Sequence, residues 1–188
     1  MVLTSERVEI AAPAGRVIRA VVVRPRASEA ARRLPAVLAY SDIFQLTGPH
    51  VRVCERLAGY GYVVVLPEIF ARLGLGAVAL DFERDRQLAL DSTERMELAW
   101  FDEDRATILG WLRAQPDVDA ARLLACGWCI GGHLAFRAAQ EADIKATRDL
   151  IRAGQLLKID VLDHVIIGRA SQERPKDYVS LRELGYFY

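Results

Sequence analysis

Residues Leu123–Ala135 constrain the fold more than any other part of this chain. Their sequence, LLACGWCIGGHLA, joins a short apolar run to a helical pattern through three glycines. Cys129 stands between Gly127 and Gly131, and a sharp turn leaves no room for side chains two residues to either side of its apex. The segment therefore predicts a strand over Leu123–Gly127, a tight turn that presents Cys129, and a helix that begins directly afterwards.

Strands and helices alternate along the rest of the chain. Four more apolar runs, bounded by proline, glycine or polar loops, predict strands at Arg16–Arg24, Pro35–Ser41, Tyr62–Pro67 and Val161–Ile167. Helical spacing predicts helices that begin at Pro49, after an N-cap at Asp102, and over Glu141–Leu157. In the first of these helices Val53, Cys54 and Leu57 share the apolar face, whereas residues 71–97 predict an exposed excursion.

This alternation is typical of an α/β domain in which helices cover both faces of a mostly parallel sheet, an αβα sandwich. The length of 188 residues suits a single domain of that kind, residues 1–188.

Composition excludes several functions. Twenty-five basic residues balance 25 acidic ones, so no net charge favours nucleic acid or an anionic membrane as a partner. The apolar runs are too short to span a bilayer, and the first ten residues lack the apolar core of a secretory signal. Three cysteines are too few for a disulfide scaffold, and they favour a reducing, cytoplasmic location.

Cys129 is the candidate nucleophile. At the start of a helix its thiolate would be favoured by the helix dipole, and the N–H of Ile130 would be placed to bind an oxyanion. Two alternatives remain open: a small buried cysteine in a glycine-rich turn, and a redox pair of Cys126 with Cys129. The expected position of Cys126 inside a strand disfavours the redox pair. Cys54 is predicted to be a core residue of its helix.

Three stretches resemble the dienelactone hydrolase family, α/β-hydrolases that use a cysteine nucleophile. They are Tyr40–Phe44 (YSDIF), Gly59–Arg72 (GYGYVVVLPEIFAR) and Gly127–Phe136 (GWCIGGHLAF), and the likeness runs from about Val8 to Ala139. The resemblance implies hydrolysis of a small-molecule ester or lactone, without a cofactor, through an acyl-enzyme on Cys129.

The resemblance also implies roles for four other residues. The N–H groups of Ile43 and Ile130 would form the oxyanion hole. Asp42 stands where the family has a glutamate that contacts the resting thiol, and its side chain is one methylene shorter. Arg72 matches the family's arginine that helps to bind a substrate carboxylate, although a surface arginine is the alternative.

The end of the chain resembles a different family. The run Glu141–Gly168 (EADIKATRDLIRAGQLLKIDVLDHVIIG) and the later YVSLRELG are similar to the C-terminal portion of RadC-type proteins, which carry a JAB/MPN-like metallopeptidase fold. All three lysines of the chain, Lys145, Lys158 and Lys176, lie in this part. The chain therefore resembles a fusion of a dienelactone-hydrolase-like part, residues 1–139, and a RadC-like part, residues 140–188.

We expect the strand at Val161–Ile167 to continue the main sheet in parallel, with a helix break near Gln140–Asp143 before it. No metal site is expected, because the zinc site of the RadC-type family needs an H-x-H pair and the histidines of this chain are isolated from one another. Asp143 matches one ligand of that site and is better explained as a solvated residue at a helix start.

A cysteine nucleophile normally needs an imidazole base oriented by an acid. The acid and histidine that the dienelactone hydrolase family carries downstream are absent from the RadC-like part, so the sequence predicts a hydrolase with impaired turnover. His50, His133 and His164 are weak candidates for a replacement base. The alternatives are a non-catalytic chimeric α/β protein or binding scaffold, and a zinc peptidase or DNA-repair factor, which the missing H-x-H pair and the neutral charge disfavour.

Overall fold

A computed structural model of the chain divides into two compact units, Met1–Ala138 and Ala139–Tyr188. The structure describes residues 2–26, 33–76, 78–135, 137–138, 147–148, 151–152, 155, 158, 161–163, 165–167, 178–185 and 187. The organisation of the whole chain as one domain stays a prediction.

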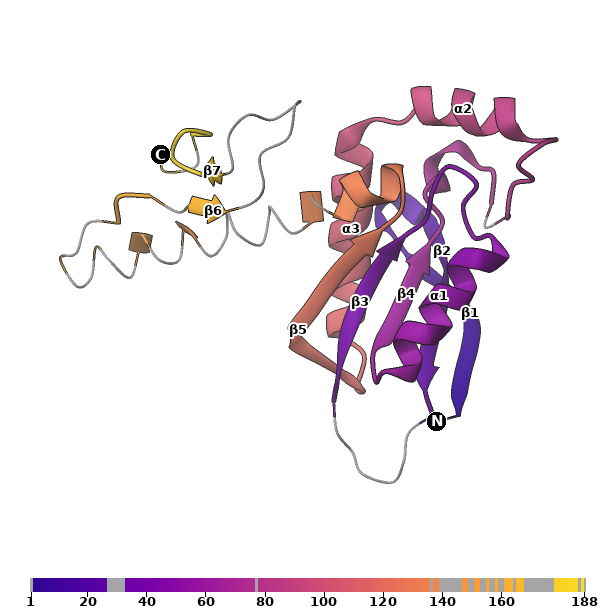
Figure 1. Cartoon of the computed structure of the whole chain (residues 1–188), viewed down its shortest axis with the longest axis horizontal. Helices are drawn as coiled ribbons and strands as arrows, with labels where there is room; N and C mark the ends of the chain where they lie inside the picture. Colours follow the sequence, from indigo (N-terminus) through magenta and orange to yellow (C-terminus); the bar gives the residue numbers. More distant parts are fainter. Residues whose placement is uncertain are drawn as a thin grey trace. The chain divides into compact units, whose positions relative to one another are not determined.

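A five-stranded mixed sheet in the order β1-β2-β4-β3-β5 forms the centre of the first unit (Figure 1). Its strands are β1 (Leu3–Ala11), β2 (Val17–Pro25), β3 (Leu34–Tyr40), β4 (Val63–Pro67) and β5 (Val118–Gly127). β3 pairs in parallel with both β4 and β5, whereas β2 is antiparallel to β4 and β1 is antiparallel to β2. The parallel part of the sheet is the part that leads into the turn at Cys129.

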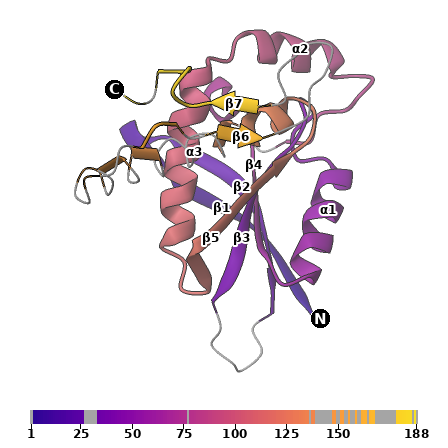
Figure 2. The same ribbon diagram turned by 60° about the vertical axis from the view of Figure 1, so that its left-hand side comes forward.

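Helices cover both faces of this sheet. They are α1 (Gly48–Gly59), α2 (Arg86–Glu94) and α3 (Leu98–Arg113), with single 3-10 turns at η1 (Pro13–Gly15) and η2 (Ala71–Leu73). Figure 2 shows α1 on one side of the strands and α3 on the other. This arrangement confirms the predicted α/β class and the αβα sandwich.

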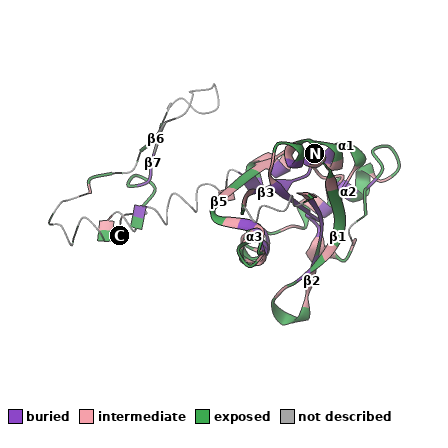
Figure 3. Ribbon diagram, turned by 90° about the horizontal axis from the view of Figure 1, so that it is seen from below, coloured by how far each residue is buried: buried purple, intermediate pink, exposed green. Residues whose placement is uncertain are grey.

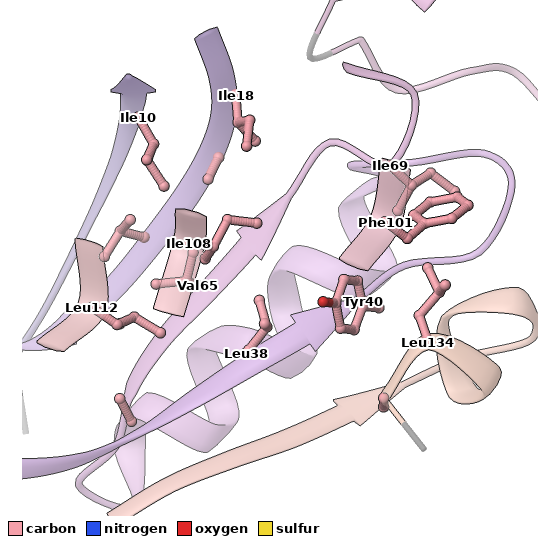
Figure 4. Packing of buried hydrophobic residues seen from close by; sticks show 14 of the residues in the cluster. Ile10, Ile18, Leu38, Tyr40, Val65, Ile69, Phe101, Ile108, Leu112 and Leu134 are labelled. Carbon is pink, nitrogen blue, oxygen red and sulfur yellow. The ribbon is translucent and has the colours of Figure 1, made fainter. Parts of the chain in front are cut away.

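Each face of the sheet has its own core. Leu38 and Val65 point toward α3, where they pack with Phe101, Ile108 and Leu112 (Figure 4). On the other face a smaller cluster includes Cys54 and Ala58 of α1. All five residues of β4 are buried, because this strand lies between β2 and β3 and is covered on both faces. A strand in such a position is apolar throughout. The outer strand β1 is mostly exposed, in contrast to the buried centre (Figure 3).

Three local features differ from the sequence-based expectations. Residues 3–11 are mostly exposed and give no strand signal, yet they form β1 because they pair along their whole length with β2. The excursion at residues 71–97 contains α2. α3 begins at Leu98 after an extended Glu97, so Asp102 lies within the helix and is not its N-cap. The apolar residues Phe101, Ile108 and Leu112 are buried on one side of α3.

The buried face of α1 is also rotated from the predicted one. Val53 is 37% exposed, whereas His50, Cys54 and Ala58 are buried. These three residues are spaced four apart and form a single stripe along a helix. The helix begins at Gly48 with Pro49 in its first turn, as predicted.

The second unit contains a separate two-stranded sheet in which β6 (Val165–Ile167) is antiparallel to β7 (Tyr178–Ser180). The prediction that this strand continues the main sheet in parallel was therefore wrong. Pairing with a segment nearby in sequence costs little loop-closure entropy. Asp163 accepts hydrogen bonds from the Ser180 hydroxyl (2.6 Å) and the Arg182 N–H (3.1 Å). These bonds join the segment before β6 to the end of β7.

Among the described residues of the helix predicted over 141–157, residues 147–148, 151–152 and 155 are helical. The break predicted near Gln140–Asp143 lies outside the described residues. Within the described part of the chain, no helix combines the length and apolar character needed to cross a bilayer.

Candidate functional site

Cys129 lies at the apex of a sharp strand-to-helix turn. β5 ends at Gly127, and the next helix covers residues 130–135 and 137–138. The backbone of Cys129 is in the left-handed region, with φ 55°, and the residue is exposed. A non-glycine residue in this region costs about 1–3 kcal/mol and persists only where its surroundings enforce it. The turn therefore presents the thiol outward at an energetic cost, and the alternative of a buried Cys129 does not describe this structure.

Two glycines make this turn possible. A Cβ atom at Gly127 would collide with the carbonyl of Gly131, and one at Gly131 would collide with the carbonyls of Tyr40 and Ser41. The expectation that side chains are excluded at both positions is confirmed. The turn at residues 127–131, which we call the elbow, therefore packs directly on the backbone at the end of β3. The N–H of Trp128 donates a 3.1 Å hydrogen bond to the Tyr40 carbonyl.

The loop after β3, residues 41–47, carries two of the other predicted site residues, Asp42 and Ile43; we call it the oxyanion loop. The carboxylate of Asp42 accepts a 2.8 Å hydrogen bond from the N–H of Phe44, and the Asp42 carbonyl accepts one of 3.0 Å from the N–H of Gln45. These bonds close a turn around Ile43. In the part of the chain that the structure describes, the N–H groups of Ile43 and Ile130 have no hydrogen-bond acceptor.

Asp42 and His50 face each other beside the elbow. Nε2 of His50 is 3.7 Å from Oδ2 of Asp42, and its Nδ1 is 2.7 Å from the hydroxyl of Thr47. The His50 ring also contacts the Trp128 ring, with centroids 5.2 Å apart. Thr47 is the N-cap residue of α1, but its hydroxyl binds this imidazole and makes no capping bond. His50 is therefore held between the oxyanion loop and the residue next to Cys129.

The other two histidines differ. His133 is exposed on the helix after the elbow, and His164 lies outside the described residues. Of the two candidate bases that the structure describes, His50 is the one in contact with both Asp42 and Trp128.

Arg72 lies in η2 and is tied to α3. Its guanidinium donates to Glu103 (2.6 Å) and Asp104 (2.9 Å) and lies 5.6 Å from the centroid of the Trp100 ring. Burial opposes its charge, but these two carboxylates outweigh burial and raise the pKa of Arg72. A substrate carboxylate would therefore meet a guanidinium that already has two acidic partners.

Glu68 and Gln45 are buried polar residues to which sequence patterns assigned no role. Glu68 directly follows β4, is 4% exposed, and accepts a 2.8 Å hydrogen bond from the N–H of Arg19 on one carboxylate oxygen. Its other oxygen has no partner among the described residues. Burial raises the pKa of Glu68. The available signal was an acidic residue directly after a fully apolar strand.

The remaining cysteines are less suited to chemistry than Cys129. Cys126 lies in β5 as predicted, and burial raises its pKa. Burial also raises the pKa of Cys54 in α1 to about 12. All three cysteines are free thiols. In the described part of the chain no group of three or more His, Cys, Asp or Glu side chains could hold a metal ion, and Asp143 is not among the described residues.

The comparison with known proteins agrees with this geometry. Residues 18–150 match the profile of the Dienelactone hydrolase family. The chain belongs to the dienelactone hydrolase family. It is 34% identical over 140 residues to a Saccharomyces cerevisiae protein named as a candidate carboxymethylenebutenolidase, an alignment that covers 73% of this chain and 51% of that protein.

A solved structure supports the same fold. The crystal structure of a candidate dienelactone hydrolase from Klebsiella pneumoniae aligns with a TM-score of 0.60 and 26% identity, and covers 70% of this chain and 52% of that one. The chain thus spans about half the length of the relatives that it matches, which makes it a truncated α/β-hydrolase-like fold.

Residues 137–186 match the RadC-like JAB domain. A UPF0758 protein from Chloroflexus aggregans is 58% identical to this chain over 43 residues, which cover 23% of this chain and 16% of that protein. Both predicted resemblances are confirmed, and the two matches overlap at residues 137–150, next to the boundary between the two compact units.

Proposed function

We propose that this protein reacts with small-molecule esters or lactones through Cys129 and that its turnover is slow. The observation that supports this function most is the exposed, left-handed Cys129 at the N-terminal end of a helix. In the described part of the chain, the N–H groups of Ile130, the next residue, and of Ile43 in the oxyanion loop have no acceptor. Membership of the dienelactone hydrolase family supports the ester or lactone as substrate class. The three free thiols suit a cytoplasmic setting.

In the proposed reaction the Cys129 sulfur forms a bond to the substrate carbonyl carbon. The negative charge that develops on the carbonyl oxygen is stabilised by the N–H groups of Ile43 and Ile130. The bond from the carbon to the alcohol oxygen then breaks, and this oxygen takes up the proton that the thiol lost; an ester releases its alcohol, whereas a lactone ring opens and its hydroxyl group stays on the acyl chain. Water finally cleaves the thioester to release the acid and restore the thiol.

The second step is the one we expect to be slow, because attack by water needs a base. Both ring nitrogens of His50 already face other groups, Thr47 and Asp42. The carboxylate of Asp42 in turn holds the N–H of Phe44. A substrate carboxylate would bind at Arg72 in competition with Asp104 and Glu103.

Intact-protein mass spectrometry after addition of p-nitrophenyl acetate tests the proposal. We expect one acetyl group per chain and a burst of p-nitrophenol followed by slow release. Cys129→Ala should abolish the acetylation, whereas the matched control Cys126→Ala should retain it. Fast multiple turnover would contradict the impairment, and no acetylation of Cys129 would favour the alternative of a non-catalytic chimeric protein or binding scaffold.

A further inference from the structure

Gln45 combines two unusual properties at the centre of the oxyanion loop. Its side chain is fully buried, and its backbone is left-handed with φ 62°. A residue with a Cβ atom is uncommon in this region, and such residues cluster at functional sites, where neighbouring structure enforces them. Hydrogen bonds from both the side chain and the backbone of Gln45 hold it in this conformation.

The amide group of Gln45 fastens the segment that follows β4. Its Oε1 accepts a hydrogen bond from the N–H of Phe70 (3.3 Å), and its Nε2 donates to the carbonyls of Gly76 (3.3 Å) and Val78 (3.1 Å). One residue earlier, the Phe44 carbonyl accepts a hydrogen bond of 3.0 Å from the N–H of Leu80. The segment held in this way, residues 70–80, contains Arg72.

The backbone of Gln45 fixes the oxyanion loop itself. Its N–H donates to the Asp42 carbonyl (3.0 Å), which closes the turn that carries Ile43. Its carbonyl accepts from the N–H of Thr47 (2.9 Å), the residue that precedes α1. Gln45 thus joins three parts: the turn with the Ile43 amide, the start of α1, and the Arg72 segment.

We propose that Gln45 is a positioning residue that holds the Ile43 N–H in the oxyanion hole and keeps the Arg72 segment in a fixed position relative to that N–H. This inference rests on the proposed acyl transfer at Cys129. We call the three hydrogen bonds of the Gln45 side chain the tether. Without it, the turn around Ile43 keeps its local hydrogen bonds but is no longer attached to the Arg72 segment through Gln45, so the Ile43 N–H no longer has one fixed direction. An oxyanion hole depends on such preorganisation.

Two reactions of Cys129 separate this role from general disruption. Acetylation by p-nitrophenyl acetate passes through an oxyanion, whereas alkylation by iodoacetamide does not. In Gln45→Met, which keeps the size and loses the hydrogen bonds, we expect acetylation to slow by about 10-fold to 100-fold, up to the lower end of the effect of removing one oxyanion donor. Alkylation should stay within about twofold, because it needs no oxyanion hole.

Two further variants complete the test. Gln45→Gly tolerates the left-handed backbone and removes only the tether, so it should also slow acetylation selectively and serves if Gln45→Met does not fold. Gln87→Met changes an exposed glutamine of α2 that bonds Asp91, and should leave both rates unchanged. Equal acetylation in wild type and in the folded Gln45 variants, or a parallel fall of both rates, would overturn the inference.

Hydrogen exchange tests the tether independently of the chemistry. The amides of Phe70 and Leu80 should exchange faster in Gln45→Met and Gln45→Gly than in the wild type, and unchanged protection would refute the tether. If the wild type is alkylated but never acetylated, the proposed function fails. Exchange at these amides then still decides whether Gln45 holds the Arg72 segment.

Discussion

A single methyl group added at neighbouring glycines of the elbow should have opposite effects. In Gly131→Ala the new Cβ would collide with the backbone carbonyls of Tyr40 and Ser41, which cannot move independently of β3. We expect the free energy of unfolding to fall by about 1–3 kcal/mol or more, as for other overpacked sites. Urea denaturation followed by circular dichroism measures the change.

Gly132→Ala is the matched control. Its Cβ would lie 3.5 Å from the Gly127 carbonyl, which is an ordinary contact. Since alanine favours a helix over glycine, this variant should be as stable as the wild type or more stable by up to about 1 kcal/mol. Equal losses in the two variants would contradict the steric explanation.

Glu68 should make stability depend on pH in an unusual direction. Burial raises the pKa of its carboxyl in the folded state, although the Arg19 N–H and guanidinium partly oppose this. The folded state then binds the proton more tightly than the unfolded state, where the pKa is about 4.3. The contribution of Glu68 to stability is therefore greatest below that pH and is lost as the pH rises through the folded-state pKa.

Glu68→Gln removes this titration and keeps an oxygen that can accept the Arg19 N–H. At pH 7 we expect the variant to be more stable than the wild type by on the order of 1 kcal/mol, with the gain shrinking toward pH 4. Denaturant unfolding at several pH values gives the comparison, and the exposed Glu83→Gln serves as control. A gain that is constant with pH, or a loss at pH 7, would contradict burial as the dominant cause.

At the scale of elements, apolar pattern and turn chemistry predicted what local sequence controls. β3, β4, β5 and the turn at Cys129 follow from apolar runs and from glycines at fixed spacing. β1 was missed because its pairing with β2 is tertiary and its own residues are mostly polar. His50 was predicted to lie in the first turn of its helix, near the loop that carries Asp42, but the contact between these two side chains depends on how α1 follows that loop.

The carboxylate of Asp104 links α3 to two segments that precede it in the chain. It accepts hydrogen bonds from Arg16 (3.0 Å), just after η1, and from Arg72 (2.9 Å) in η2, and its side chain is only 12% exposed. Asp104→Asn removes the charge that both guanidinium groups face. We expect a loss of about 1–3 kcal/mol in the free energy of unfolding, because hydrogen bonds to buried charges are worth more than neutral ones.

Asp119→Asn is a suitable comparison for Asp104→Asn. Asp119 also binds an arginine, Arg122, at 2.6 Å, but this pair lies at the surface on β5. Removing this surface ion pair should not change the free energy of unfolding measurably in the same denaturation experiment. If both variants lose equal stability, the position of Asp104 between η1, η2 and α3 is not what gives it weight.

At the scale of the molecule, two independent boundaries nearly coincide. The compact units meet between Ala138 and Ala139, and the RadC-like match begins at residue 137. The lysines of the chain all lie beyond this point. The dienelactone hydrolase match ends at residue 150, so the two family matches overlap at residues 137–150, around the boundary of the compact units. These changes of family, composition and compact unit within a short stretch support the interpretation of the chain as a fusion.

We predict that the fused chain nevertheless unfolds as one cooperative domain. A unit of about 50 residues is near the lower limit for independent stability, and two-stranded sheets are marginal by themselves. The tryptophans Trp100, Trp111 and Trp128 all lie in the first unit, so their fluorescence reports on that unit alone. Leu181, in the second unit, is fully buried. Leu181→Ala should therefore lower the urea midpoint read by tryptophan fluorescence, by an amount that corresponds to about 2–5 kcal/mol.

Val65→Ala, in the core of the first unit, provides the reference for this experiment. It should lower the same midpoint whether or not the units are coupled, because Val65 is fully buried in β4. A fluorescence midpoint that responds to Val65→Ala and not to Leu181→Ala would show that the two units unfold independently. The chain would then be two domains, and the unit that carries Cys129 would be stable by its own core.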